Sequence, residues 1–365
     1  MMSTLNSLNL LYNPFKDLTP NAGPDQLFWA GVDDIRIKIE RIYNETIRNN
    51  SKQVILNWGP YGGGKTYSAF YFLQKEGEKN NLTHLYIKSA KEGSVAVDEL
   101  LKSIIEYLTF EKVQGQINSI IASIGEKAFI SFLTPISGRE FAKTIALIGS
   151  NDPDIVEYMN RFLYAGLTKA ELKKLGLAKD IKTDIDTVKF LTGILACFMG
   201  NNEFVNGKVV LWIDEMEDLI YYSPKTYKIF SQVLRELIDN IPDRFCIFMN
   251  FTLSEGEENT IELVLGGAVW SRITRKIRFK QFSTEDAEKY CNQLLALARI
   301  NKDSLTPFDT SLQNEILSLI QANELIPREI NKRFNSLISF CLDHDISNIR
   351  QDVINKWLEE YSDDN

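Results

Sequence analysis

A glycine-rich segment, GPYGGGKT from Gly59 to Thr66, combines four glycines with a lysine and a hydroxyl side chain. It fits the pattern G-x-x-x-x-G-K-[ST], in which glycines let successive backbone N–H groups point inward and hold phosphate oxygens. In this pattern the lysine reaches the β- and γ-phosphates, and the hydroxyl binds Mg²⁺. The alternative is a plain glycine-rich turn. The residues predicted to bind nucleotide are Gly59, Pro60, Tyr61, Gly62, Gly63, Gly64, Lys65, Thr66 and Tyr67.

An apolar segment that ends in two acids, VVLWIDE from Val209 to Glu215, is the second chemical feature. A buried strand that ends in Asp214 delivers a carboxylate to the edge of a sheet, where it can hold Mg²⁺ together with Thr66. Glu215 is then placed to polarise an attacking water. For the next two acids, Glu217 and Asp218, we favour the solvated start of a helix.

Two further polar residues could complete a hydrolytic site. FCIFMN is predicted to be a strand that ends in Asn250, whose amide would help to orient the attacking water. The alternative is an ordinary turn former at a strand end. Arg328, in IPREINKRF, lies at a predicted helix start and could meet the γ-phosphate; the alternative is a solvent-exposed arginine.

A basic segment, SRITRKIRFK from Ser271 to Lys280, contains five lysines and arginines. The whole chain has a formal net charge of −8, so binding to nucleic acid would require a local basic face of this kind. One interpretation is contact with DNA phosphates. Another is an alternating strand that exposes its charged face.

Buried strands alternate with helices and indicate how these residues are positioned. The order predicts a parallel α/β sheet covered by helices on both faces. Three parts are expected: an N-terminal segment (1–31), an α/β core (32–282) with a helical insert at about 95–200, and an all-helical lid (283–365). The predicted strands are Gln53–Trp58, Thr83–Lys88, Val209–Ile213, Phe245–Asn250 and Lys276–Phe279.

The composition of the 365 residues, 44% hydrophobic and 25% charged, is ordinary for a globular protein. Four scattered cysteines without a CxxC pair, and only two histidines, argue against a zinc site and a disulfide framework. No apolar run approaches the ~18 residues of a membrane span, and no signal peptide is visible. We therefore expect a cytoplasmic protein with no membrane partner.

The order of these motifs resembles that of an AAA+ P-loop ATPase, over about residues 13–345. The motifs are the glycine loop, the acid-tipped strand, the Asn-tipped strand and a helical lid with Pro-Arg. Within that class, NPF, SRITRKIRF before FSTEDAEKY, and PRE are similar to the origin-recognition/initiator and transposition-ATPase branch. LTKAELKKLGL ahead of WIDEMEDL also resembles BREX-type phage-defence ATPases. The long separation between Thr66 and Asp214 departs from the pattern of a compact module.

The resemblance implies a homo-oligomer in which an arginine finger reaches the nucleotide of a neighbouring subunit. Arg272 matches that position best, followed by Arg275, and Arg278 is a further candidate. Such an arginine increases the rate of phosphoryl transfer by about 10³- to 10⁵-fold. It also offers another explanation of the basic segment.

The resemblance also implies that the N-terminal segment covers the adenine. Asn13, Pro14 and Phe15 are the expected contacts, with Phe28 and Trp29 as stacking partners. The alternative for these aromatic residues is a place in the core.

The function implied by the resemblance is slow, oligomer-dependent hydrolysis of Mg-ATP that drives assembly or remodelling. The setting would be DNA in prokaryotic phage defence or mobile-element control, with a further protein partner. The alternative is a nucleotide-dependent signalling switch, or a scaffold of a defence complex, with little turnover.

Overall fold

The computed structural model describes residues 4–16, 27–49, 51–76, 81–91, 95–164, 166–177, 180–253 and 258–363. They divide into two compact units. Unit 1 is drawn from Met1–Lys38, Gly59–Gln74 and Phe279–Asn365, and unit 2 from Ile39–Trp58 and Lys75–Arg278. This grouping by contacts cuts across the three consecutive domains predicted above, because the N-terminal segment and the glycine loop group with the C-terminal helices.

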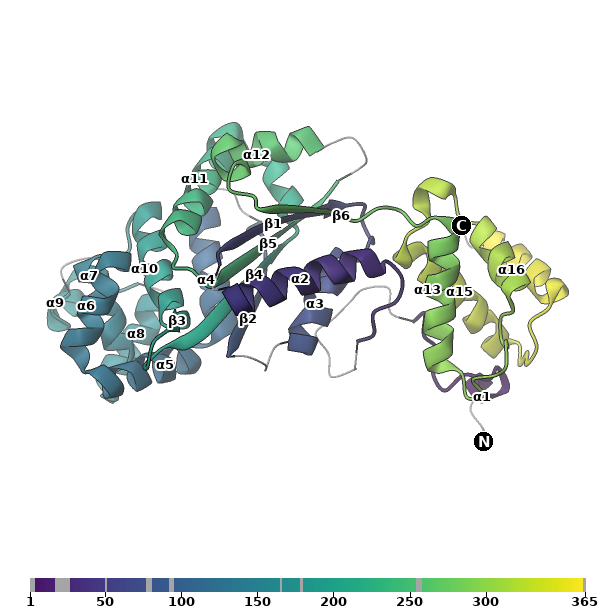
Figure 1. Ribbon diagram of the computed structural model, residues 1–365, viewed down its shortest axis with the longest axis horizontal. Helices are drawn as coiled ribbons and strands as arrows, with labels where there is room; N and C mark the ends of the chain where they lie inside the picture. Colours follow the sequence, from purple (N-terminus) through teal and green to yellow (C-terminus); the bar gives the residue numbers. More distant parts are fainter. Residues whose placement is uncertain are drawn as a thin grey trace. The chain divides into compact units, whose positions relative to one another are not determined.

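A five-stranded parallel sheet forms the centre of unit 2 and confirms the predicted fold class (Figure 1). The strand order is β2-β4-β5-β1-β6, and a short strand, β3, pairs antiparallel with β4. The strands read as nearly continuous apolar runs because both faces of the sheet are covered. Their bounds are β1 Gln53–Gly59, β2 Leu82–Lys88, β3 Gly200–Asn201, β4 Asn206–Asp214, β5 Phe245–Thr252 and β6 Arg275–Arg278.

One face of the sheet packs against α2 (Asp33–Asn49) through aromatic side chains. Trp212 of β4 and Phe248 of β5 stack with ring centroids 3.9 Å apart. Tyr43 of α2 stacks on Phe248, and its hydroxyl accepts a hydrogen bond of 3.0 Å from the indole of Trp212. These contacts fix the helix against the two strands that carry Asp214 and Asn250.

We expect Trp212→Ala to lower the free energy of unfolding by about 3–5 kcal/mol, because the indole is fully buried and its removal leaves a cavity. Chemical denaturation followed by circular dichroism measures this effect. Tyr221→Ala is the control: the Tyr221 side chain is 84% exposed, so a change within about 0.5 kcal/mol is expected. Equal effects of the two substitutions would contradict the packing described.

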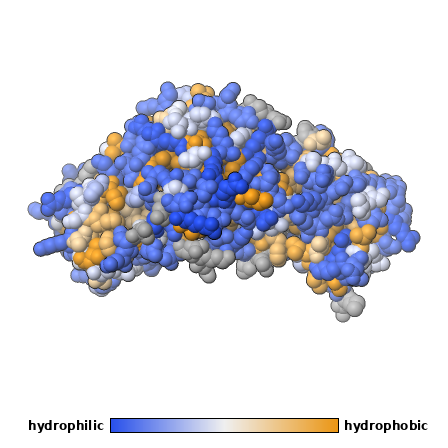
Figure 2. Space-filling model, in the orientation of Figure 1, coloured by the Kyte–Doolittle hydropathy of each residue, from blue (hydrophilic) through white to orange (hydrophobic). Residues whose placement is uncertain are grey.

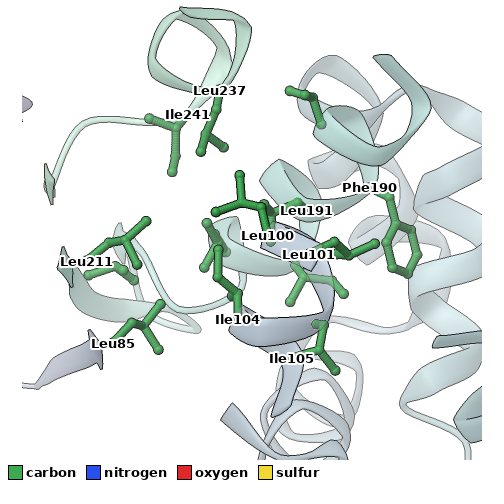
Figure 3. Packing of buried hydrophobic residues seen from close by; sticks show 14 of the residues in the cluster. Leu85, Leu100, Leu101, Ile104, Ile105, Phe190, Leu191, Leu211, Leu237 and Ile241 are labelled. Atoms are coloured by element: carbon green, nitrogen blue, oxygen red, sulfur yellow. The ribbon is translucent and has the colours of Figure 1, made fainter. Parts of the chain in front are cut away.

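The opposite face of the sheet packs against α4 (Ala96–Leu108), α10 (Asp184–Ala196) and α11 (Pro224–Asn240). Leu85 and Leu211 of the sheet face Leu100 and Ile104 of α4, as Figure 3 shows. This helix therefore contributes a large share of the cover over β2 and β4. Further helices of unit 2 are η2 (Met216–Tyr221) and α12 (Glu258–Trp270).

The predicted insert is helical and shares its core with the sheet. A single hydrophobic cluster runs from β2 and β4 through α4 and α10 into the outer helices. Figure 2 shows a mainly hydrophilic surface on the face in view. In the part of the chain that the structure describes, no single helix is long and apolar enough to cross a bilayer, although the bent pair α5–α6 meets both criteria jointly. The outer helices are α5 Phe110–Ile124, α6 Glu126–Ser137, α7 Arg139–Ile148, α8 Pro153–Tyr164 and α9 Lys169–Lys174.

Unit 1 has a hydrophobic core of its own, which joins the N-terminal segment to the C-terminal helices. Leu10 pairs with Arg299 in an antiparallel bridge. Ser283 and Asp286 form a capping box at the start of α13, which begins where the predicted helical lid begins. Two helices of unit 1 come early in the chain: α1 (Thr4–Ser7), and α3 (Lys65–Glu76), which follows β1. The helices that come after the last strand are α13 Thr284–Ala298, α14 Thr310–Ser318, η3 Ala322–Glu324, α15 Pro327–Asp343 and α16 Gln351–Asp363.

Candidate nucleotide-binding site

The glycine-rich segment is a loop between β1 and α3, as the phosphate-binding pattern requires. Gly62 has φ of +77°, a left-handed conformation that glycine adopts without steric cost. At Gly59 a Cβ atom would lie 2.1 Å from the Phe279 carbonyl oxygen, so only glycine fits there. The first N–H groups of α3 have no acceptor within the helix and provide donors for an anion.

Lys65 is folded onto the glycine loop. Its Nζ donates to the carbonyl oxygens of Gly59 at 2.9 Å and Pro60 at 2.8 Å, and the residue is buried. Thr66 follows it in the first turn of α3 and is half-buried. Both residues therefore occupy the positions that the pattern assigns to the phosphate-binding lysine and the Mg²⁺-binding hydroxyl.

A row of hydrogen bonds crosses unit 2 at the carboxyl ends of four neighbouring strands. Asn57 of β1 donates to the Asn250 side-chain oxygen at 3.0 Å, and Asn250 of β5 donates to Asp214 Oδ1 at 3.1 Å. From β2, the Tyr86 hydroxyl donates to Asp214 Oδ2 at 2.8 Å. Burial, together with the charge of Asp214, raises the pKa of Tyr86 well above its usual value, so the phenol remains a donor at neutral pH.

The structure thus brings Asp214 and Asn250 together, and it adds Asn57 and Tyr86, which sequence reasoning missed. The available signal was that both lie near the ends of predicted strands. Their role became visible only with the strand order, because β1 and β2 lie on opposite sides of the β4–β5 pair.

Asp214 suits Mg²⁺. Its two oxygens accept the hydrogen bonds from Asn250 and Tyr86, and a carboxylate offers about four lone-pair positions in all. Mg²⁺ in phosphate-transfer sites takes one or two protein oxygens, phosphate oxygens and water. Among the described residues no cluster of three or more His, Cys, Asp or Glu could hold a metal.

Glu215 has a left-handed backbone, with φ of 58° and ψ of 34°, where the chain leaves β4. Its side chain forms an ion pair of 2.6 Å with Lys88, the last residue of β2. Lys88 is a third residue that sequence reasoning missed. Glu217, interpreted above as a solvated acid, accepts a hydrogen bond of 2.9 Å from the Thr252 N–H and so joins η2 to β5.

Arg328 lies against the glycine loop. It occupies the first turn of α15, after Pro327. Its guanidinium carbon is 4.0 Å from the centroid of the Tyr61 ring. The structure therefore brings the predicted lid arginine and the predicted loop together within unit 1.

The arginine-finger candidates all have carboxylate neighbours in their own chain. Arg272 donates to both carboxylate oxygens of Asp239, at 2.5 and 2.7 Å. Arg275 pairs with Glu45, and Arg278 lies 3.7 Å from Glu258. Arg272 precedes β6, and Arg275 and Arg278 are its first and last residues, three positions apart, so the three arginines do not share one face of a strand. Action in a neighbouring subunit stays a prediction.

The N-terminal residues differ from the adenine contacts expected above. Phe15 is fully buried and stacks on Phe334 with ring centroids 4.7 Å apart, so its ring offers no face to a base. Asn13 donates to the side chain of Asn335 at 2.7 Å. The alternative, a place in the core, therefore describes Phe15 in this structure.

The next described part of the N-terminal segment lies along α3. The Tyr67 hydroxyl accepts from the Phe28 N–H at 3.0 Å and donates to the Phe28 carbonyl at 2.5 Å. Gln74 accepts from Leu27 at 2.7 Å, and Trp29 makes an edge contact with Tyr71. Tyr67, predicted to bind nucleotide, thus anchors this segment. Phe28 is 36% exposed, so its ring has surface for a base.

Known proteins resemble this chain in three-dimensional fold and not in sequence. No family model matches the sequence, and no curated protein is similar enough to match. Among solved structures, the chain is similar to the Aeropyrum pernix ORC2 protein in its ADP form, with 12% identity, a TM-score of 0.51 and coverage of 95% of this chain and 72% of that one. Aeropyrum pernix ORC1 in complex with DNA has 11% identity, a TM-score of 0.50 and coverage of 94% and 68%.

Drosophila ORC bound to DNA has 10% identity, a TM-score of 0.53 and coverage of 98% of this chain and 66% of that one. At such low identities the likeness concerns the fold. It confirms the resemblance to origin-recognition ATPases at that level, whereas the links to transposition and BREX-type ATPases stay predictions. The chain has the fold of the origin-recognition AAA+ proteins.

Proposed function

We propose that this chain is an AAA+ ATPase that binds Mg-ATP at the loop from Gly59 to Thr66 and hydrolyses it slowly. The observation that carries the proposal is the loop itself. It lies between a parallel strand and a helix, holds the Lys65 ammonium group, and contacts Arg328 of α15. The ADP form of a similarly folded ORC2 protein supports a nucleotide as ligand.

Each residue then has a defined role. Backbone N–H groups of the loop and the Lys65 ammonium would bind the phosphates; Thr66 and Asp214 would be the residues that hold Mg²⁺, which would neutralise charge on the phosphate oxygens. Asn57 orients the Asn250 side chain, and Asn250 and Tyr86 orient the Asp214 carboxylate through their hydrogen bonds. Glu215 takes the proton of the attacking water, and Arg328 compensates charge on the γ-phosphate.

The wider role that we propose is ATP-dependent assembly or remodelling on DNA, in phage defence or mobile-element control, by a homo-oligomer. Its support is the fold shared with ORC structures in complex with DNA. A switch with little turnover is the second candidate. The Lys88–Glu215 ion pair favours it, because that pair engages the carboxylate assigned as the base.

Mg²⁺ dependence tests the proposal. We expect Asp214→Asn to raise the Mg²⁺ concentration needed for half-maximal ATP hydrolysis at least about 10-fold, since even indirect ligand contacts are worth 10- to 100-fold in metal affinity. The Tyr86 hydroxyl can accept from the new amide, so the fold is preserved. Asp218→Asn, four residues away, is the control. Unchanged hydrolysis in a chelator would refute the assignment.

A further inference from the structure

We propose that Tyr61 is a positioning residue that holds Arg328 over the glycine loop and so makes the site prefer a nucleoside triphosphate to a diphosphate. The inference rests on the proposed ATP site and adds a residue that sets its selectivity. It starts from the contact between the third residue of the loop and the first turn of α15.

The contact has the geometry of a cation–π interaction. The Arg328 guanidinium carbon lies 4.0 Å from the ring centroid, well inside the limit of about 6 Å. The Tyr61 side chain is 67% exposed, so core packing does not account for a large aromatic residue at this position. An interaction with the lid arginine does.

A second observation shows that the arginine stem lies close to the loop backbone. A Cβ atom added at Gly62 would be 2.7 Å from Arg328 Cβ and 3.3 Å from Arg328 Cδ. It would also be 3.3 Å from Cδ1 of Ile326, the residue that caps α15. Gly62 therefore admits the start of α15 to the loop, while Tyr61 receives the end of the arginine side chain.

Stacking on Tyr61 suits an arginine that must bind phosphate. A guanidinium contacts an aromatic ring through its face, whereas its N–H donors lie in its plane and match phosphate oxygens bidentately. Holding this flexible side chain in place before the ligand arrives reduces the entropy lost on binding. Because ADP lacks the γ-phosphate, the benefit falls on ATP alone.

The test is a double-mutant cycle of binding affinities. Titration calorimetry with Mg²⁺ measures the Kd of a non-hydrolysable ATP analogue and of ADP for the wild type, Tyr61→Ala, Arg328→Ala and the double variant. We expect Tyr61→Ala to weaken binding of the ATP analogue about 2- to 5-fold, the range of an exposed cation–π contact, and to leave ADP unchanged. In the Arg328→Ala background, Tyr61→Ala should have no further effect.

Tyr61→Phe is the matched control, because it retains the ring and should retain the ratio of the two affinities. Equal weakening of both nucleotides by Tyr61→Ala would overturn the inference, and so would an undiminished effect of Tyr61→Ala without Arg328. Either result would leave the ATP site intact. Wild-type protein that binds neither nucleotide would instead refute the proposed function.

Discussion

Replacement of Lys65 by methionine is expected to weaken ATP binding by about 10- to 100-fold. A hydrogen bond to a charged group contributes about 1.5–3 kcal/mol, and 1.4 kcal/mol corresponds to tenfold in affinity. Methionine keeps an unbranched side chain that fills the buried position, so the loss concerns the ammonium group that donates to Gly59 and Pro60. Titration calorimetry with ATP and Mg²⁺ gives the affinity directly.

Lys75→Met is the matched control for this substitution. Lys75 lies at the other end of α3, where it pairs with Glu40 at 2.6 Å. Its loss should alter stability by at most about 1 kcal/mol, because the pair is partly solvated, and should leave ATP affinity unchanged. Similar ATP affinities of Lys65→Met and the wild type would show that the loop is not the phosphate site.

Glu215→Gln is expected to lower kcat of ATP hydrolysis by about 10²- to 10⁴-fold, with little change in ATP affinity. That range is the usual contribution of a positioned general base, and glutamine has the shape of glutamate without the basicity. The amide oxygen can still accept from Lys88, so the local fold is expected to persist. A coupled ATPase assay and calorimetry on one preparation separate turnover from binding.

Glu217→Gln controls for the loss of a nearby acid. Glu217 accepts from the Thr252 N–H, which an amide oxygen can also do. The turnover of the Glu217→Gln variant should match that of the wild type. If Glu215→Gln kept full activity, the water would be activated by another group; if the wild type bound ATP without measurable turnover, the switch would be the better description.

Much of the sheet could be predicted because buried parallel strands are apolar throughout. The runs that end in Asp214 and Asn250 have one boundary or both within two residues of the strands observed, and the glycine loop has a recognisable pattern. These features are local in sequence. Their chemistry therefore follows from residue type and spacing.

The remaining features depend on contacts between distant parts of the chain. Phe15 stacks on Phe334, which is more than three hundred residues away in the chain. Phe15 is therefore a core residue although the segment around it has the composition of a turn. Tyr86 reaches Asp214 only because β2 pairs with β4 in the register that aligns Lys88 with Asp214. Arg272, in the turn between α12 and β6, meets Asp239 of α11. No local pattern encodes any of these pairings.

The shared core of insert and sheet bears on how this chain could be divided. Leu85 and Leu211 are covered by Leu100 and Ile104 of α4. Excision of the segment between β2 and β4 would therefore uncover an apolar face of the sheet, and the excised helices would lose the surface on which they pack. The segment between β2 and β4 is thus not a detachable accessory. Trimming it away would not leave a folded minimal version of the protein, and its helices could not be grafted onto another protein without a replacement for that face.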